Sequence, residues 1–94
     1  MAEEKKTLLD AIKAFGTEAQ IDMAIEECSE LVNALCKYRR GRVGMPEVIT
    51  EIADVQIMTK QLALMFGEEA VRNESDRKLE RLASRIEKHN INAL

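Results

Sequence analysis

Apolar residues recur three and four positions apart through most of the chain, and glycine interrupts this pattern at three places. The interruptions are Gly16, the segment 41–46 with its glycines and Pro46, and Gly67. A spacing of three and four is typical of amphipathic helices, and glycine commonly follows the last turn of a helix. The pattern therefore predicts four helices, over about residues 3–15, 17–40, 46–66 and 68–89.

The second predicted helix carries a mixed flank beside its apolar face. We expect the apolar face to be buried; it contains Ile21, Ala24, Ile25, Cys28, Leu31, Val32 and Leu35. The flank combines acids with apolar and amide side chains, namely Gln20, Met23, Glu27, Glu30, Ala34 and Tyr38. At the start of this helix the segment "TEAQ" predicts a capping box, in which Thr17 caps the helix and Gln20 reaches back.

The third predicted helix is apolar on nearly every side and still contains two acids. Its main apolar stripe consists of Val48, Ile52, Val55, Met58, Leu62, Met65 and Phe66. A helix of this kind is expected to be buried on most of its surface. Glu51 falls inside the stripe and Asp54 at its edge, and an unpaired buried carboxylate would cost several kcal/mol. These acids must therefore be protonated, hydrogen-bonded or bound to a cation.

Two acidic pairs, Glu27 with Glu30 and Glu51 with Asp54, occupy these two helices. Side chains three residues apart share one face of a helix, with β-carbons about 5–6 Å apart. If the helices face each other in antiparallel fashion, four carboxylates converge on one small volume. Their mutual repulsion favours a hard divalent cation, and an all-oxygen set of ligands favours Mg²⁺ or Mn²⁺. Bound Mg²⁺ commonly meets a substrate phosphate, which points toward phosphate chemistry.

A purely structural interpretation of the same acids stays open. They are also compatible with solvated flank positions, or with ion pairs to Lys60, Lys78 or Arg81. The basic run "KYRRGR" over 37–42 suggests nucleic-acid binding, but it contains one aromatic residue and falls at a helix end, where basic residues favour the helix dipole. The formal net charge of −3 also argues against a nucleic-acid partner.

Composition and length favour one small all-α domain over residues 1–94, with its motif-bearing core at 17–89. The chain is 46% hydrophobic, 33% charged and only 3% aromatic, as in packed helices. The expected architecture is therefore four-helix and bundle-like. Because a chain of this size buries only a modest core, we expect a homodimer or homotetramer.

The cysteines and the N-terminus indicate a soluble, cytoplasmic protein without a membrane partner. No secretory signal pattern and no long uncharged run is visible. Cys28 and Cys36 lie eight residues apart on one predicted helix, about 12 Å along its axis, and cannot form a disulfide with each other there. We expect both to be reduced and buried as small hydrophobic side chains.

The acidic blocks also resemble a known family. Glu27-x-x-Glu30 followed by Glu51-x-x-Asp54 resembles the metal signature of the MazG-like all-α nucleoside triphosphate pyrophosphohydrolases. The segments "IEECSELVNALCKYRRG" and "VITEIADVQIM" are similar to the two motif helices of that family, and "KLERLASRI" is similar to its basic segment. The resemblance covers residues 20–86 and is closest to the short single-domain members.

This resemblance implies hydrolysis of an NTP or dNTP between its α- and β-phosphates, which releases a monophosphate and pyrophosphate. It implies that four acids hold Mg²⁺, with Mn²⁺ as a substitute: Glu27, Glu30, Glu51 and Asp54. Either Glu27 or Glu30 would also be catalytic, by orienting or deprotonating the attacking water. Family members build their sites from helices of neighbouring subunits, which agrees with the expected oligomer.

Three further residues are expected to contact the substrate. Lys78 and Arg81 occupy the K-L-x-x-R positions of the family's basic segment, so the resemblance implies that they contact phosphates. For both, ion pairing within the helix is an equally good interpretation. Gln20 shares the flank of Glu27 and is a weaker candidate, because the capping box offers it another role.

Two other classes of function compete with this one. A di-iron bundle would need Glu-x-x-His motifs, whereas the single histidine, His89, has no glutamate three residues before it. A catalytically inactive helical oligomer that binds metal or nucleotide, or that mediates protein interactions, remains the main alternative. Release of pyrophosphate from a panel of nucleotides distinguishes that alternative from an enzyme.

Overall fold

The computed structural model describes residues 2–93, and all of its regular structure is helical. The four helices are α1 (Ala2–Phe15), α2 (Thr17–Arg39), α3 (Met45–Phe66) and α4 (Glu68–Ala93). Their ends lie within one residue of the predicted ones, except that α4 continues beyond residue 89. The all-α prediction is therefore confirmed.

Single glycines join α1 to α2 and α3 to α4 without any intervening loop. Gly16 has φ +94°, donates its N–H to the Ile12 carbonyl and accepts the N–H of Gln20. The predicted capping box at Thr17 is wrong, because the N-cap of α2 is Gly16 and no side chain caps this end. A residue with positive φ turns the chain here, and the side chain of Gln20 is used elsewhere.

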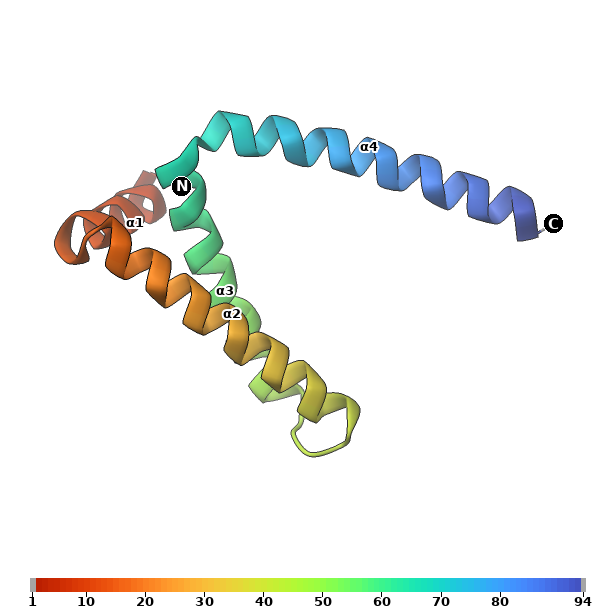
Figure 1. Cartoon of the computed structure of the whole chain (residues 1–94), viewed down its shortest axis with the longest axis horizontal. Coiled ribbons are helices and arrows are strands. Elements are labelled where there is room, and N and C mark those ends of the chain that lie inside the picture. Colours follow the sequence, from red (N-terminus) through yellow and green to blue (C-terminus); the bar gives the residue numbers. More distant parts are fainter. Residues whose placement is uncertain (1, 94) are drawn as a thin grey trace.

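The connection between α2 and α3 begins and ends as the glycine and proline signals predict. Gly41 has φ +70°, a conformation that glycine adopts without steric cost. Pro46 lies in the first turn of α3, where a missing N–H costs no helical hydrogen bond. The Glu47 carboxylate accepts the N–H of Gly44 at 3.1 Å and so caps the helix. The short connection turns the chain back, so that α2 and α3 run antiparallel (Figure 1).

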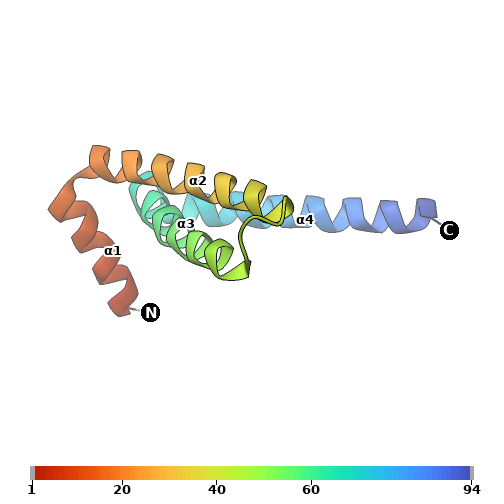
Figure 2. The same ribbon diagram turned by 90° about the horizontal axis from the view of Figure 1, so that it is seen from below.

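The contact between α2 and α3 is the main packing surface of the chain, as Figures 1 and 2 both show. Its buried residues are Gln20, Ala24 and Ala34 from α2 and Met58 and Gln61 from α3. The small alanines allow the two backbones to approach, and the mixed flank of α2 therefore faces α3.

The predicted burial of the apolar face of α2 is correct for Ala24 and wrong for much of the rest. Ile25 and Val32 are 64% and 61% exposed, and Leu35 is also exposed. Both cysteines are exposed as well, so the expectation that they are buried is wrong for the single chain. The physical reason is that α3 covers the flank of α2, while no other helix of the described chain covers this face.

Much of α3 is open too, in contrast to the predicted burial on most sides. Ile49, Ile52, Ile57 and Phe66 are exposed, although Met58 is 5% exposed and belongs to the core. The apolar character of α3 therefore exceeds what α1 and α2 cover within one chain.

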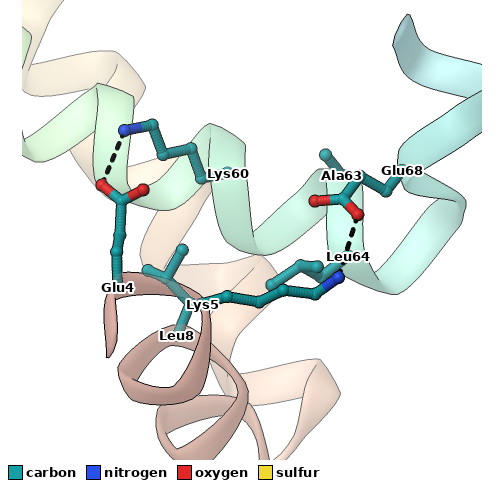
Figure 3. Close-up of a pocket in the computed structure, with 7 residues that line it drawn as sticks. All are labelled: Glu4, Lys5, Leu8, Lys60, Ala63, Leu64 and Glu68. Atoms are coloured by element: carbon teal, nitrogen blue, oxygen red, sulfur yellow. Dashed lines mark hydrogen bonds and ion pairs between the residues drawn. The ribbon is translucent and has the colours of Figure 1, made fainter. Parts of the chain in front are cut away.

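Helix α1 packs across α3 near the junction with α4 (Figure 3). Leu8 is buried, and ion pairs lie on either side of it. Lys60 Nζ contacts Glu4 Oε1 at 2.8 Å, and Lys5 Nζ contacts Glu68 Oε1 at 3.1 Å. Such half-exposed pairs contribute modestly and are screened by salt.

Helix α4 extends away from the other three helices (Figures 1 and 2). All its described residues are exposed, including Leu79, Leu82 and Ile86. One chain therefore supplies four helices without closing them into a compact bundle. Within residues 2–93, no helix combines the length and the apolar character needed to cross a bilayer.

Candidate metal centre between α2 and α3

The antiparallel pairing of α2 and α3 brings the two acidic pairs face to face. Glu27 lies opposite Asp54, and Glu30 lies opposite Glu51; in each case the carboxyl groups are close enough for one to raise the pKa of the other. The two acids of each pair are three positions apart in the sequence, and the two helices run in opposite directions. The spacing seen in the sequence therefore becomes one acidic group in space.

Three of the four carboxylates form a tight cluster. Glu27, Glu51 and Asp54 each place one carboxylate oxygen within 4.8 Å of the others. All three side chains are half-buried, whereas Glu30 is exposed at the edge of the cluster. The prediction of converging acids is confirmed for three residues, and Glu30 lies beside them rather than among them.

Two oxygen atoms of this cluster lack a partner. Glu27 Oε2 and Glu51 Oε2 are buried, and neither makes a hydrogen bond within the described chain. Buried polar atoms are nearly always hydrogen-bonded in folded proteins, so a pair of unpartnered carboxylate oxygens calls for an explanation. Both atoms belong to residues of the cluster.

Burial and crowding both disfavour the ionised form of these groups. Burial raises the pKa of the Glu27 carboxyl, and the charges of Glu30 and Asp54 raise it further. The pKa of Glu51 is also raised, first by burial and then by the charges of Glu30 and Asp54. The cluster therefore attracts positive charge.

No basic side chain supplies that charge within the described part of the chain. None of the ion pairs among residues 2–93 includes an acid of the cluster, and Lys60 is bound to Glu4 instead. Lys78 and Arg81 lie on α4, which makes no contact with α2. Lys60 therefore does not neutralise the acids of the cluster in this structure.

The donor set fits a hard divalent cation. Its atoms are all carboxylate oxygens, which suit Mg²⁺ and Mn²⁺, and two of the three residues carry a buried oxygen without a hydrogen-bond partner. Three half-buried carboxylates would leave positions for water, as is usual for Mg²⁺. Glu27, Glu51 and Asp54 could hold the ion directly, with Glu30 at its exposed side.

A hollow of about 200 Å³ adjoins the acids toward the α2–α3 turn. Glu30 and Glu51 line it together with Asn33, Lys37 and Glu47. Asn33 and Lys37 were not among the predicted site residues. Their positions three and seven residues after Glu30 place them on the same side of α2, and this spacing was the signal available in the sequence.

The three predicted substrate contacts lie elsewhere. Lys78 and Arg81 are exposed on α4. Gln20 is 7% exposed and donates from Nε2 to Gln61 Oε1 at 2.7 Å, at the far end of the α2–α3 contact. A contact of these side chains with substrate stays a prediction.

Comparison with known proteins adds no relative to this description. No family model matches the chain, and no curated protein or solved structure matches it significantly.

Proposed function

We propose that this chain is a Mg²⁺-dependent nucleoside triphosphate pyrophosphohydrolase of the MazG-like type. The observation that carries the proposal is the convergence of Glu27, Glu51 and Asp54, with two buried oxygens that lack partners. The resemblance of the acidic blocks to the MazG-like signature supplies the substrate class, an NTP or dNTP. A role in removing unwanted nucleotides from the cellular pool would follow from this activity.

The proposed reaction cleaves the bond between the α- and β-phosphates. Water adds to the α-phosphorus while the bridging P–O bond breaks, which gives a monophosphate and pyrophosphate. When bound, Mg²⁺ supplies charge neutralisation on the phosphate oxygens. Glu27 would orient or deprotonate the attacking water through an oxygen that the ion leaves free. Glu30 is the second candidate for this role, since it lies at the exposed edge.

Lys37 is the basic side chain that lines the hollow beside Glu30 and Glu51. Its ammonium group makes no ion pair with the surrounding carboxylates in the described chain. In the proposed complex it contacts a phosphate oxygen of the substrate, and Asn33 offers a neutral donor on the same side. This part of the site comes from one chain.

The proposal includes a homodimer or homotetramer in which a partner subunit completes the site. The hollow of about 200 Å³ is smaller than the roughly 300–1,000 Å³ typical of ligand pockets. The apolar faces of α2, α3 and α4 are exposed, and α4 extends away from α2 and α3, the helices that carry the acidic cluster. A second copy packed on these faces would cover them and bring Lys78 and Arg81 to the acids of the first.

A substrate panel tests the proposal directly. The chain is incubated with each of the common NTPs and dNTPs and with Mg²⁺, and pyrophosphate and monophosphate are measured. The expected result is equal release of the two products from at least one nucleotide, and its loss in Glu51→Gln. Absence of pyrophosphate with every nucleotide would contradict the enzyme and favour the inactive binding module.

A further inference from the structure

The most deeply buried polar contact of the chain lies away from the acids, at the other end of the α2–α3 interface. Gln20 and Gln61 are 7% and 4% exposed, and Gln20 Nε2 donates to Gln61 Oε1 at 2.7 Å. Within residues 2–93 this is the one side-chain hydrogen bond between an amide of α2 and an amide of α3. Buried amides are costly unless they are paired, so this contact depends on the exact alignment of the two helices.

One register of α2 against α3 brings together both the two amides and the acids. Gln20 precedes Glu27 by seven residues, and Gln61 follows Asp54 by seven residues. Because the helices run antiparallel, both steps cover the same distance, about 10.5 Å or nearly two turns. The alignment that joins Gln20 to Gln61 is therefore the one that places Glu27 opposite Asp54.

The apolar contacts of the interface select this alignment less strictly than a hydrogen bond does. Ala24, Ala34 and Met58 contribute apolar contacts, which have little directionality and tolerate a shift along the helix. Without a cation, repulsion among the acids favours any shift that separates them. A shift by one turn, about 5.4 Å, would also leave both buried amides without partners.

We propose that the Gln20–Gln61 hydrogen bond sets the register of α2 against α3 and so holds the acids ready for a divalent cation. Both glutamines are positioning residues, which act through Glu27, Glu51 and Asp54. The role assigned to the cation rests on the proposed function, whereas the register itself is a property of the metal-free chain. Buried polar side chains have this effect in coiled coils, where a single asparagine fixes the register.

The test replaces both amides by an apolar side chain of similar size, in the double variant Gln20→Met/Gln61→Met. Spin labels are attached at Ser29→Cys and Gln56→Cys, two exposed positions of α2 and α3, after Cys28→Ser and Cys36→Ser remove the native thiols. Electron–electron distance measurements are made without metal, with labelled protein diluted in unlabelled protein so that only distances within one chain are recorded. The expected result is a single narrow distance with the glutamines present, and a shifted or broadened distribution in the double variant.

The same double variant, without labels, then reports on the acids through Mn²⁺ affinity, measured from the signal of the free ion. We expect weakening on the order of tenfold, the range seen when groups that orient metal ligands are removed. The thermal midpoint should be retained, because the double replacement leaves no unpaired amide; the single variants Gln20→Met and Gln61→Met should lower it.

Each outcome separates the two proposals. An unchanged distance distribution in the double variant overturns the inference, and so does a changed distribution with wild-type Mn²⁺ affinity. A wild-type protein that binds no Mn²⁺ refutes the proposed metal centre, while the distance measurement still decides whether the glutamines set the register.

Discussion

Glu27 and Glu51 carry negative charge at a helix contact where, among residues 2–93, neither forms an ion pair. Their raised pKa values have the same causes, which are burial first and neighbouring carboxylates next. The metal-free protein therefore gains stability when these carboxylates bind protons. At neutral pH the proposed cation would neutralise them instead.

The pH dependence of stability follows from these shifts. The pKa of each group is higher in the folded chain than its ordinary value of 4.5. At pH values between the ordinary pKa and the raised pKa of a group, the folded chain binds more protons than the unfolded chain. The free energy of unfolding therefore falls as pH rises through this range. We expect metal-free wild type to lose stability above about pH 4.5 relative to Glu27→Gln/Glu51→Gln, as measured by urea unfolding at several pH values in EDTA.

The comparison between the two proteins removes the contributions of all other groups. The stability difference should be smallest below the ordinary pKa and should increase through the raised values. A difference that is constant with pH would mean that these carboxyls titrate normally, which would contradict the crowding found at the cluster.

Lys37 provides the second prediction at this scale. Lys37→Ala should raise KM for the active nucleotide on the order of tenfold, because a charge-assisted hydrogen bond to phosphate is lost. Lys13→Ala, an exposed lysine in the last turn of α1, is the matched control and should leave KM unchanged. Equal kinetics of both variants would exclude a substrate contact by Lys37.

At the scale of the elements, the positions of glycine and proline were enough to predict the three junctions between the helices, whereas the end of α4 has no such signal and was placed too early. Gly67 shows why: its N–H donates to Ala63, and its carbonyl accepts from Val71, so one residue ends α3 and starts α4. Helix ends are local features of the chain. Gln20 shows the limit of such local reasoning, because its partner Gln61 is distant in the sequence.

The packed faces were harder to predict than the helix ends. The apolar face of α2 was expected in the core, but Ala24 and Ala34 permit close approach along the flank that carries Glu27. Hydrophobic patterning shows which surface avoids water, and it does not say whether the same chain or another copy covers that surface. The acidic convergence was predicted on the assumption that α2 and α3 face each other in antiparallel fashion, but the sequence pattern did not supply the register that aligns the acids.

The positive φ of Gly67, at the junction of α3 and α4, gives a prediction for the stability of the chain. Gly67 has φ +122°, and an added β-carbon would lie 3.5 Å from that of Ala70, an ordinary contact. The cost of Gly67→Ala therefore comes from the backbone, about 1–3 kcal/mol. Gly44→Ala is the control, because Gly44 has φ −94°. Urea unfolding should show the larger loss for Gly67→Ala; equal losses would show that the positive φ is not required.

For the whole molecule, the open apolar faces and the extended α4 predict that active sites are shared between subunits. Glu51→Gln and Lys78→Ala should each abolish or strongly reduce activity alone. When equal amounts of the two variants exchange subunits in a symmetric dimer, about half of the dimers contain one subunit of each kind, and one of the two sites in each such dimer carries neither change. The mixture should therefore recover about one quarter of wild-type activity. Absence of recovery, with exchange verified by native mass spectrometry, would place each site within a single chain.

The most direct test of the account is the thermal midpoint of the chain as a function of Mg²⁺. A cation bound only by the folded state raises the midpoint, by about 10 °C or more at a hundredfold excess over its dissociation constant. We expect this rise in wild type and in Glu26→Gln, whose exposed carboxylate lies outside the cluster, and a much smaller rise in Glu51→Ala. An unchanged wild-type midpoint across millimolar Mg²⁺ would contradict the metal centre.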